Sequence, residues 1–264
     1  RIGRSVFRVL SSIDEIDVVG INDLFDNKTL AYLLQYDTVM GVFRKDVDYD
    51  DTGLIVEGKH INITNEKDPA CLKWADLNVD VVIEATGIFR DRASLEKHLQ
   101  AGAKRVVLTV PPKDEIDAMV VMGVNDNELT SADRLVSNAS CTTNCLAPIA
   151  YVLDKEFGIE DGVMTTVHAY TNDQRLADVP HKDFRRSRAA AENIIPTTTG
   201  AAKAVGKILP HLEGRLDGMA VRVPISDGSI VDLVVRLKTK ASGQEINAAI
   251  EHAAQKELQG IVQF

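Results

Sequence analysis

Two hydrophobic patterns follow one another along this chain. Up to about residue 139, short apolar runs alternate with amphipathic stretches of helical period. Near-continuous apolar runs are typical of strands covered on both faces, and their alternation with helices predicts a mostly parallel sheet. The predicted strands are Asp17–Asp23, Val79–Gly87, Lys104–Val110, Met119–Val124 and Arg134–Ser137, and the predicted helices are Gly3–Ser12 and Asp91–Ala101. A charged stretch at residues 41–64, with the turn sequence Asp50-Asp51-Thr52-Gly53, predicts inserted hairpin strands.

The second half has a different pattern. Helices are predicted at Cys141–Phe157 and Gly200–Leu209, and a strand at Gly162–Tyr170. The segment Asn172–Asn193 is long, polar and basic with little periodicity, and long ordered loops of this kind are often functional.

The end of the chain adds two strands and a helix. Met219–Ile225 and Gly228–Lys238 are β-rich and only two residues apart, so they predict an antiparallel hairpin. Ser242 and Glu245 form a capping box that starts a helix running to about Gly260. The predicted fold class is therefore α/β. A Rossmann-type parallel-sheet domain at residues 1–139 precedes an α+β domain with a mixed or antiparallel sheet at residues 140–264.

Composition narrows the class of protein. The chain has 264 residues, of which 45% are hydrophobic and 26% charged, as in globular proteins. No apolar run approaches the roughly 20 residues of a membrane helix. The net charge of -9 argues against a general affinity for nucleic acid or anionic lipid. Three cysteines form no disulfide framework and suit a reducing compartment, so the cytoplasm is the expected location.

Weak features of a dinucleotide site lie in the first half. Gly3 stands at a helix start, and Asp23 follows 20 residues later at the end of the next strand. In a nucleotide-binding βαβ unit the pyrophosphate rests on the helix start and such an acid binds the ribose. An ordinary helix-start glycine and a turn acid explain the pair equally well. If the unit is real, Asp23 favours NAD over NADP, because a carboxylate would repel a 2′-phosphate. The strand ends Ala85-Thr86-Gly87 and Thr109-Val110-Pro111 are expected at the edge where such sheets bind ligands, although either could simply terminate a strand.

The strongest local motif is Ser137-Asn138-Ala139-Ser140-Cys141-Thr142-Thr143-Asn144-Cys145, which follows a strand and begins a helix. The helix dipole and free amides there stabilise a thiolate at Cys141 and can hold an oxyanion. Cys145 lies one turn further along and is interpreted as structural. The two cysteines lack a second pair that would complete a metal site, and no metal is predicted.

Several basic and polar residues could join this cysteine. His168, near the end of the strand at Gly162–Tyr170, could pair with Cys141 as a base, although a strand histidine is more often simply packed. Arg222 stands alone in an apolar strand and needs an anion or a carboxylate such as Asp232. Basic side chains and hydroxyl donors suited to phosphate follow at Lys182, Arg185, Arg186, Arg188 and Thr197-Thr198-Thr199-Gly200.

The motifs SNASCTTNCLAP, TTVHAYTNDQ, HKDFRRSRAA, TTTGAAKAVGKILP and MAVRVP stand in this order. Together they resemble the phosphorylating, NAD-dependent glyceraldehyde-3-phosphate dehydrogenase family over essentially the whole chain. The resemblance implies an NAD-binding domain at 1–139 and a catalytic domain at 140–264. It implies that Cys141 attacks glyceraldehyde 3-phosphate, that His168 acts as general acid–base, and that inorganic phosphate releases 1,3-bisphosphoglycerate.

The same resemblance assigns the remaining site residues. Lys67 replaces an arginine common in the family, and Leu176–Pro180 is similar to the NAD-specific branch. The segment after Asn172 implies a homotetramer, because the family's loop there lies near a neighbour's cofactor. The implied phosphate-binding residues are Ser140, Thr142, Thr171, Arg185, Thr199, Gly200 and Arg222, and the implied cofactor-binding residues are Arg1, Ile2, Gly3, Asp23, Lys67 and Thr109.

Three further expectations accompany this interpretation. The family's first strand and first two motif glycines should precede Arg1, and its last strand and C-terminal helix should follow Phe264, so the chain is interpreted as an internal segment. The related erythrose-4-phosphate dehydrogenases are an alternative, but they usually lack the run at residues 198–203. A non-catalytic binding protein on a decayed scaffold is a second alternative, and the presence of Cys141, His168 and Arg222 argues against it.

Overall fold

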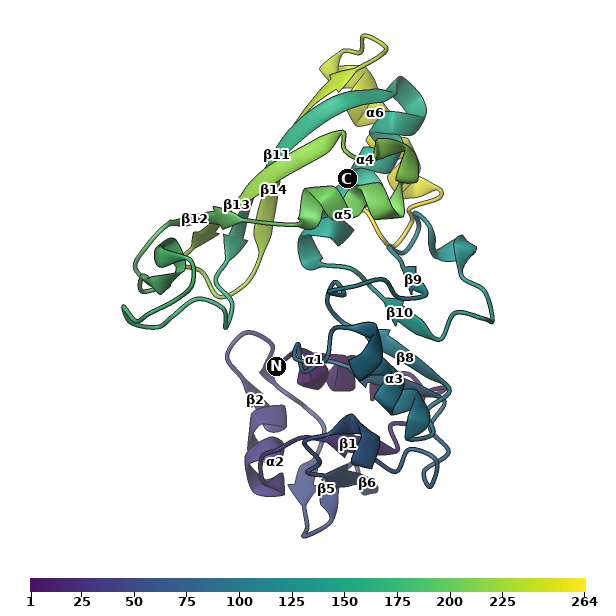
Figure 1. Cartoon of the computed structure of the whole chain (residues 1–264), viewed down its shortest axis with the longest axis vertical. Helices are drawn as coiled ribbons and strands as arrows, with labels where there is room; N and C mark the ends of the chain where they lie inside the picture. Colours follow the sequence, from purple (N-terminus) through teal and green to yellow (C-terminus); the bar gives the residue numbers. More distant parts are fainter. The chain divides into compact units, whose positions relative to one another are not determined.

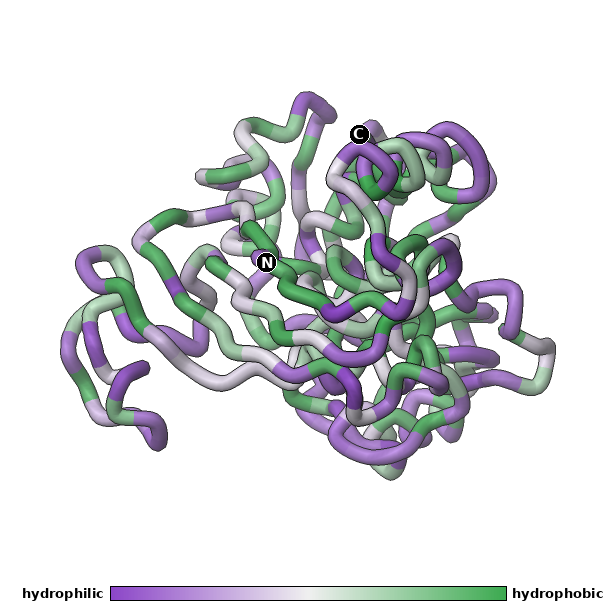
Figure 2. Tube along the Cα trace, turned by 90° about the horizontal axis from the view of Figure 1, so that it is seen from above, coloured by the Kyte–Doolittle hydropathy of each residue, from purple (hydrophilic) through white to green (hydrophobic).

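The computed structural model describes residues 1–264 and divides into two compact units (Figure 1). The first consists of Arg1–Ala118 and Ser131–Asn138, and the second of Met119–Thr130 and Ala139–Phe264. The division predicted at residues 139 and 140 would place Met119–Thr130 in the first domain, whereas this segment packs with the second unit. Hydrophobic and hydrophilic stretches alternate along the whole trace rather than separating into two blocks (Figure 2).

One sheet of the first unit has the order β1-β6-β5-β4. The strands β4, β5 and β6 pair antiparallel, as the turn-rich sequence predicts, while β6 also pairs parallel with β1. Phe7 of α1 and Leu30 and Leu34 of α2 pack on this sheet. The bounds are α1 (Ile2–Leu10), β1 (Gly20–Asn22), α2 (Asn27–Gln35), β4 (Val47–Tyr49), β5 (Gly53–Val56) and β6 (Lys59–Thr64), with a small ribbon of β2 (Tyr36–Asp37) and β3 (Gly41–Val42).

The other sheet of this unit has the order β7-β8-β10-β9. Its strands β7, β8 and β10 are parallel, which confirms the predicted alternation of strands and helices. Leu95 of α3 is completely buried against Val106, Leu108 and Leu135. The bounds are η1 (Pro69–Cys71), β7 (Val81–Glu84), α3 (Arg92–Gln100), β8 (Arg105–Leu108), β9 (Ala118–Met119) and β10 (Leu135–Ser137).

The predicted strand at Met119–Val124 is largely wrong. Only Met119 belongs to a strand, and a turn follows it. The amide of Val121 donates to the side chain of Asn125 at 2.9 Å, and Gly123 adopts a φ of 78°. Val120 and Val121 are buried beside this turn, although Met122 is 59% exposed, and buried apolar residues alone do not distinguish a turn from a strand. A short helix, η2 (Asp126–Glu128), comes next.

The sheet of the second unit has the order β12-β13-β11-β14. The predicted hairpin of β13 with β14 is wrong, because β11 lies between them, parallel to β13 and antiparallel to β14. The connection wraps around the end of β11, where Ala169 and Tyr170 donate to the carbonyls of Gly228 and Ile225. The strands are β11 (Ile159–Ala169), β12 (Ile195–Thr198), β13 (Leu216–Val223) and β14 (Ser229–Leu237).

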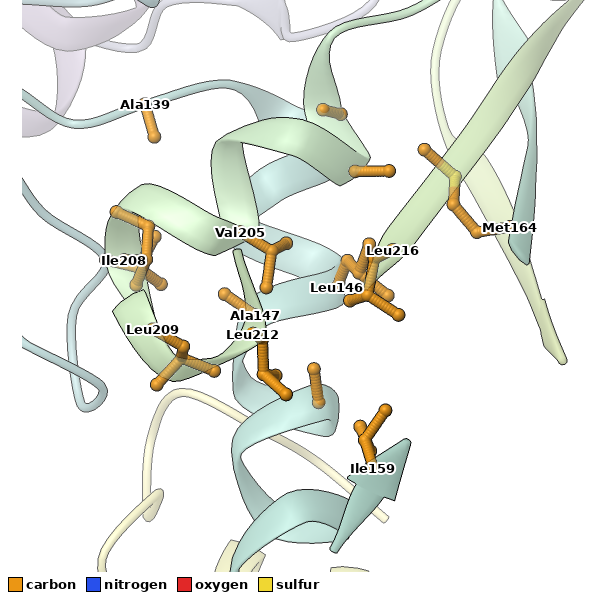
Figure 3. Close-up of a cluster of buried hydrophobic side chains, with 14 of the residues drawn as sticks. Ala139, Leu146, Ala147, Ile159, Met164, Val205, Ile208, Leu209, Leu212 and Leu216 are labelled. Carbon is orange, nitrogen blue, oxygen red and sulfur yellow. The ribbon is translucent and has the colours of Figure 1, made fainter. Parts of the chain in front are cut away.

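Helices cover one face of this sheet, as Figure 1 shows. Ala147 of α4, Val205 of α5, and Met164 and Leu216 of the sheet all belong to one cluster of buried side chains (Figure 3). This packing fixes α4, and therefore its first residue Cys141, over the sheet. The helices are α4 (Cys141–Phe157), η3 (Phe184–Ser187), α5 (Ala201–Ile208), η4 (Pro210–Leu212) and α6 (Gly243–Gln255), and the capping box at Ser242 and Glu245 is confirmed.

Candidate active site

The helix α4 begins at Cys141, as predicted. Ser140 is its N-cap, and the Ser140 hydroxyl accepts from the amide of Thr143 at 3.0 Å. Ala139 is buried with a φ of 62°, which turns the chain sharply into the helix. The sulfur of Cys141 therefore lies in the first turn, where the unpaired amides and the helix dipole favour negative charge.

His168 of β11 contacts Cys141. The Cys141 Sγ and His168 Nε2 atoms are 3.0 Å apart. The hydrogen bond with His168 lowers the pKa of the Cys141 thiol from 9.0 to about 7, and the same contact raises the pKa of His168. At Cys145, burial has the opposite effect and raises the pKa of the thiol. The structure thus separates a thiol that ionises near neutral pH from one that stays protonated.

Arg222 is the direct neighbour of His168 in the sheet, since the two residues are paired in register between β11 and β13. Arg222 Nη1 lies 2.6 Å from His168 Nδ1 and 3.0 Å from the carbonyl oxygen of Ala169. Asp232 is wrong as its partner, because it lies opposite Thr165 in β14. The Arg222 Nε atom is buried without a hydrogen-bond partner. A guanidinium with an unused donor, beside a reactive thiol, is suited to an anionic ligand.

The contact between Arg222 and His168 constrains the imidazole proton. His168 Nδ1 lies 2.6 Å from Arg222 Nη1, which can only donate, and 2.8 Å from the carbonyl oxygen of Ala169, which can only accept. The neutral ring therefore accepts from Arg222 at Nδ1, the charged ring donates from Nδ1 to the Ala169 carbonyl, and in both forms Nε2 carries a proton that faces the sulfur. Consistent with this, the charge of Arg222 opposes the rise in the pKa of His168.

Of the two adjacent arginines of the basic segment, Arg186 makes the hydrogen bonds to β12. Arg186 Nε donates to the Thr197 hydroxyl at 2.6 Å, and its Nη2 donates to the Thr198 carbonyl at 3.2 Å. Its side chain is 22% exposed and ion-paired with Asp173, whereas that of Arg185 is 55% exposed and ion-paired with Asp183. The family resemblance assigned Arg185 to phosphate binding, and nothing in the sequence of two adjacent arginines predicts which of them takes this inward position. The turn of η3 decides which one faces inward.

Four other predicted phosphate-binding residues lie at the ends of helices and strands of this unit. The amide of Thr171 donates to Gln174 Oε1 just beyond β11. Thr199 and Gly200 lie at the start of α5, where the Thr199 hydroxyl accepts from the amide of Ala201 at 3.2 Å. Thr142 is buried in the first turn of α4. The second unit therefore places hydroxyls, amides and arginines on the segments that surround β11 and β13.

The predicted cofactor residues are found in the first unit. Arg1 occupies the N-cap position of α1 and makes no capping hydrogen bond with its side chain. Gly3 lies close to Ala85, so the helix start packs against the end of β7. Asp23 follows β1, where its amide donates to the Thr64 carbonyl. Thr109 follows β8, and Lys67 is exposed between β6 and η1. The helix start and two parallel strand ends are the features to which dinucleotides bind.

Comparison with known proteins decides the family. The model described as "Glyceraldehyde 3-phosphate dehydrogenase, NAD binding domain" matches residues 1–92, and the model of the C-terminal domain matches residues 140–264. The glyceraldehyde-3-phosphate dehydrogenase 1 of Bacillus cereus is 53% identical over 265 residues, covering 100% of this chain and 79% of that protein. The Borreliella burgdorferi enzyme is 55% identical over 271 residues, covering 100% of this chain and 80% of its own length. This chain belongs to the glyceraldehyde-3-phosphate dehydrogenase family.

Membership of the glyceraldehyde-3-phosphate dehydrogenase family confirms the predicted resemblance and fold class. The protein is an NAD-dependent dehydrogenase, and the match to an NAD-binding domain identifies its cofactor. No helix is long and apolar enough to cross a membrane. The roles of the individual site residues are not tested by these likenesses, and they stay predictions.

Proposed function

We propose that this protein oxidises glyceraldehyde 3-phosphate to 1,3-bisphosphoglycerate through a thioester on Cys141. The observation that carries the proposal is the 3.0 Å contact between Cys141 Sγ and His168 Nε2 at the start of α4. A thiol with a pKa of about 7 is about half ionised to the thiolate at neutral pH. The substrate is inferred from the relatives, which are named as glyceraldehyde-3-phosphate dehydrogenases.

In the first half-reaction, the Cys141 thiolate attacks the aldehyde carbon, and the imidazolium of His168 donates its Nε2 proton to the developing oxyanion. His168 then takes the hydroxyl proton back as the thiohemiacetal is oxidised to a thioester. NAD, when bound, accepts the hydride released in this step. The amides at the start of α4 stabilise the oxyanion, because they are oriented before the reaction begins.

In the second half-reaction, an oxygen of inorganic phosphate attacks the thioester carbon. The carbon–sulfur bond breaks, Cys141 leaves as thiolate, and the acyl phosphate is 1,3-bisphosphoglycerate. A low pKa makes the thiolate a good leaving group as well as an available nucleophile. One cysteine therefore serves both half-reactions.

Two phosphate groups must be bound in this scheme, one on the substrate and one as co-substrate. We assign them to Ser140, Thr142, Thr171, Arg185, Thr199, Gly200 and Arg222. The buried, unused Nε donor of Arg222 supports its assignment. The inward position of Arg186 beside Thr197 supports adding this residue to the set. The cofactor residues are proposed as Arg1, Ile2, Gly3, Asp23, Lys67 and Thr109, on the helix start and strand ends described above.

We propose a cytoplasmic homotetramer. The face of the second unit's sheet that carries no helix exposes Val163, Met219, Ile230 and Val234. A row of apolar side chains on an uncovered sheet supports association with a second copy. The mass of the assembly in sedimentation equilibrium tests this, and a monomer at micromolar concentration would contradict it.

The decisive test is an NADH assay of the protein, expressed with any flanking residues that its gene encodes. With NAD, glyceraldehyde 3-phosphate and phosphate, NADH should form, and omission of phosphate should stop turnover after one equivalent of thioester. The variant C145S is a matched control, because it removes a thiol from the same helix, and it should stay active. If C141S keeps the activity, the proposal is wrong. Preference for erythrose 4-phosphate would point to the related enzyme instead.

A further inference from the structure

A buried chain of polar side chains crosses the first unit, away from the cysteine. Trp74 Nε1 lies 3.2 Å from His98 Nδ1, and His98 Nε2 lies 3.2 Å from Glu84 Oε2. The three residues are only 6%, 4% and 3% exposed. They come from the loop after η1, from α3 and from the end of β7. Burying a carboxylate costs free energy unless its oxygens accept hydrogen bonds, so the burial of Glu84 requires an explanation.

The hydrogen bonds fix the protons of this chain. An indole nitrogen can only donate, so His98 Nδ1 must accept, and the imidazole proton is therefore on Nε2. That proton points at Glu84 Oε2, which makes the carboxylate the acceptor. The Oε2 atom of Glu84 thus accepts a hydrogen bond from a neutral, oriented histidine, which in turn accepts one from Trp74.

The other oxygen of Glu84 faces the end of the strand. Glu84 Oε1 accepts from the amide of Thr86 at 2.7 Å and from the hydroxyl of Thr86. The same hydroxyl accepts from the amide of Ile88 at 3.1 Å. Gly87, between these two residues, has a φ of 72°, which glycine adopts readily. No atom lies within 4 Å of the place where a Cβ atom would stand, so packing does not hold the turn in this conformation. Glu84 therefore ties the buried side chains to the exposed turn Thr86–Ile88.

The backbone of Glu84 organises the neighbouring strand end in the same way. The amide and the hydroxyl of Thr109 both donate to the Glu84 carbonyl at 3.1 Å. Both threonine hydroxyls thus direct their protons toward Glu84 and leave oxygen lone pairs for a ligand. Such an edge receives hydroxyl or amide donors and disfavours a phosphate, whose oxygens are acceptors.

We propose that Glu84, oriented by His98 and Trp74, is a positioning residue for the nicotinamide half of the dinucleotide. The inference rests on the proposed function, since it concerns the same NAD site. In dinucleotide-binding sheets, the acid after the second strand holds the adenosine ribose and the later strands hold the other half. Asp23 is the acid on the adenosine side, and the turn Thr86–Ile88 together with Thr109 lies on the nicotinamide side. Glu84 acts through this turn and does not contact the ligand.

The variant E84Q tests the proposal by calorimetric titration of the whole protein with NAD and, separately, with ADP. Glutamine cannot accept from both His98 and Thr86, because one of its two ends is a donor. NAD should bind about tenfold more weakly, or about 1.4 kcal/mol, whereas ADP binding should change less than twofold. The control E96Q removes an exposed carboxylate of α3 and should leave both affinities at the wild-type value.

A double-mutant cycle with T86V separates positioning from general support. If Glu84 acts through Thr86, the loss of NAD affinity caused by E84Q should shrink to less than threefold in the T86V background. Additive losses would overturn the proposal. So would an equal loss of affinity for NAD and ADP, or an unchanged NAD affinity in folded E84Q.

If E84Q does not fold, T86V alone decides the matter, because Thr86 is exposed. T86V should then weaken NAD selectively, and an unaltered NAD affinity would contradict the proposal. Failure of the wild-type protein to bind NAD would instead refute the proposed function.

Discussion

Two histidines of this protein face an acidic partner at almost the same distance, yet their surroundings give them opposite properties. His168 lies 3.0 Å from the sulfur of the exposed Cys141, and His98 lies 3.2 Å from the carboxylate of the buried Glu84. Both nitrogens of His98 are used by fixed partners, whereas the partner of His168 is open to a ligand. The comparison teaches that pairing alone does not make a reactive site, and that access together with a free helix start does.

The largest expected effect is the loss of the nucleophile itself. C141S should lower turnover by at least about a thousandfold, because a serine hydroxyl is hardly ionised at neutral pH and the thioester cannot form. The rate of NADH formation measures this. In the comparison, H98Q should fold less stably but keep the chemistry at Cys141. A comparable loss of turnover in folded H98Q would erase the distinction between the two histidines.

The variant R222L should lower kcat/KM by about a hundredfold, since charged hydrogen bonds contribute roughly 1.5–3 kcal/mol each. The rate of Cys141 alkylation should nevertheless be retained. Arg222 lowers the pKa of His168, so its removal raises that pKa and keeps the imidazole charged beside the thiolate. Steady-state kinetics and iodoacetamide labelling together check this. Near-normal kinetics would remove Arg222 from the phosphate site.

The variant H168N tests the paired thiolate. Without the imidazole, the pKa of Cys141 should return toward 9.0, so the thiolate fraction at pH 7 falls from about one half to about one hundredth. The more basic thiolate is a better nucleophile by roughly eightfold, which offsets part of this loss. Ionisation outweighs nucleophilicity, and alkylation at pH 7 should slow about sixfold. An unchanged rate would mean that the helix start alone ionises the thiol.

The smallest expected effect concerns the cap of α4. S140A removes the acceptor for the Thr143 amide and should lower the free energy of unfolding by about 1 kcal/mol. Urea denaturation measures the change. The matched change S242A, at the cap of α6, should have a similar effect on stability and none on labelling of Cys141.

Local chemistry made parts of this molecule predictable. The bounds of α4 follow from the cap at Ser140 and from Gly158, whose φ of 68° ends the helix. The capping box of Ser242 and Glu245 likewise fixed the start of α6. The pairing of Cys141 with His168 was suggested because a helix start and a strand end carry the two residues.

Features that depend on distant contacts were not predictable. The predicted hairpin of β13 and β14 is wrong because β11, which is separated from β13 by β12 and α5 along the chain, lies between them in the sheet. The inward position of Arg186 depends on the rotation of η3. The chain of Trp74, His98 and Glu84 joins residues 24 and 14 positions apart, and no motif marks them.

The pH dependence of Cys141 alkylation tests the central claim most directly. With C145S and Cys71 replaced by serine, a single thiol remains, and its rate of reaction with iodoacetamide can be followed from pH 5 to pH 10. The thiolate is present above its pKa, so the rate should rise with a midpoint near pH 7. A midpoint near pH 9, the value of an ordinary thiol, would contradict the account.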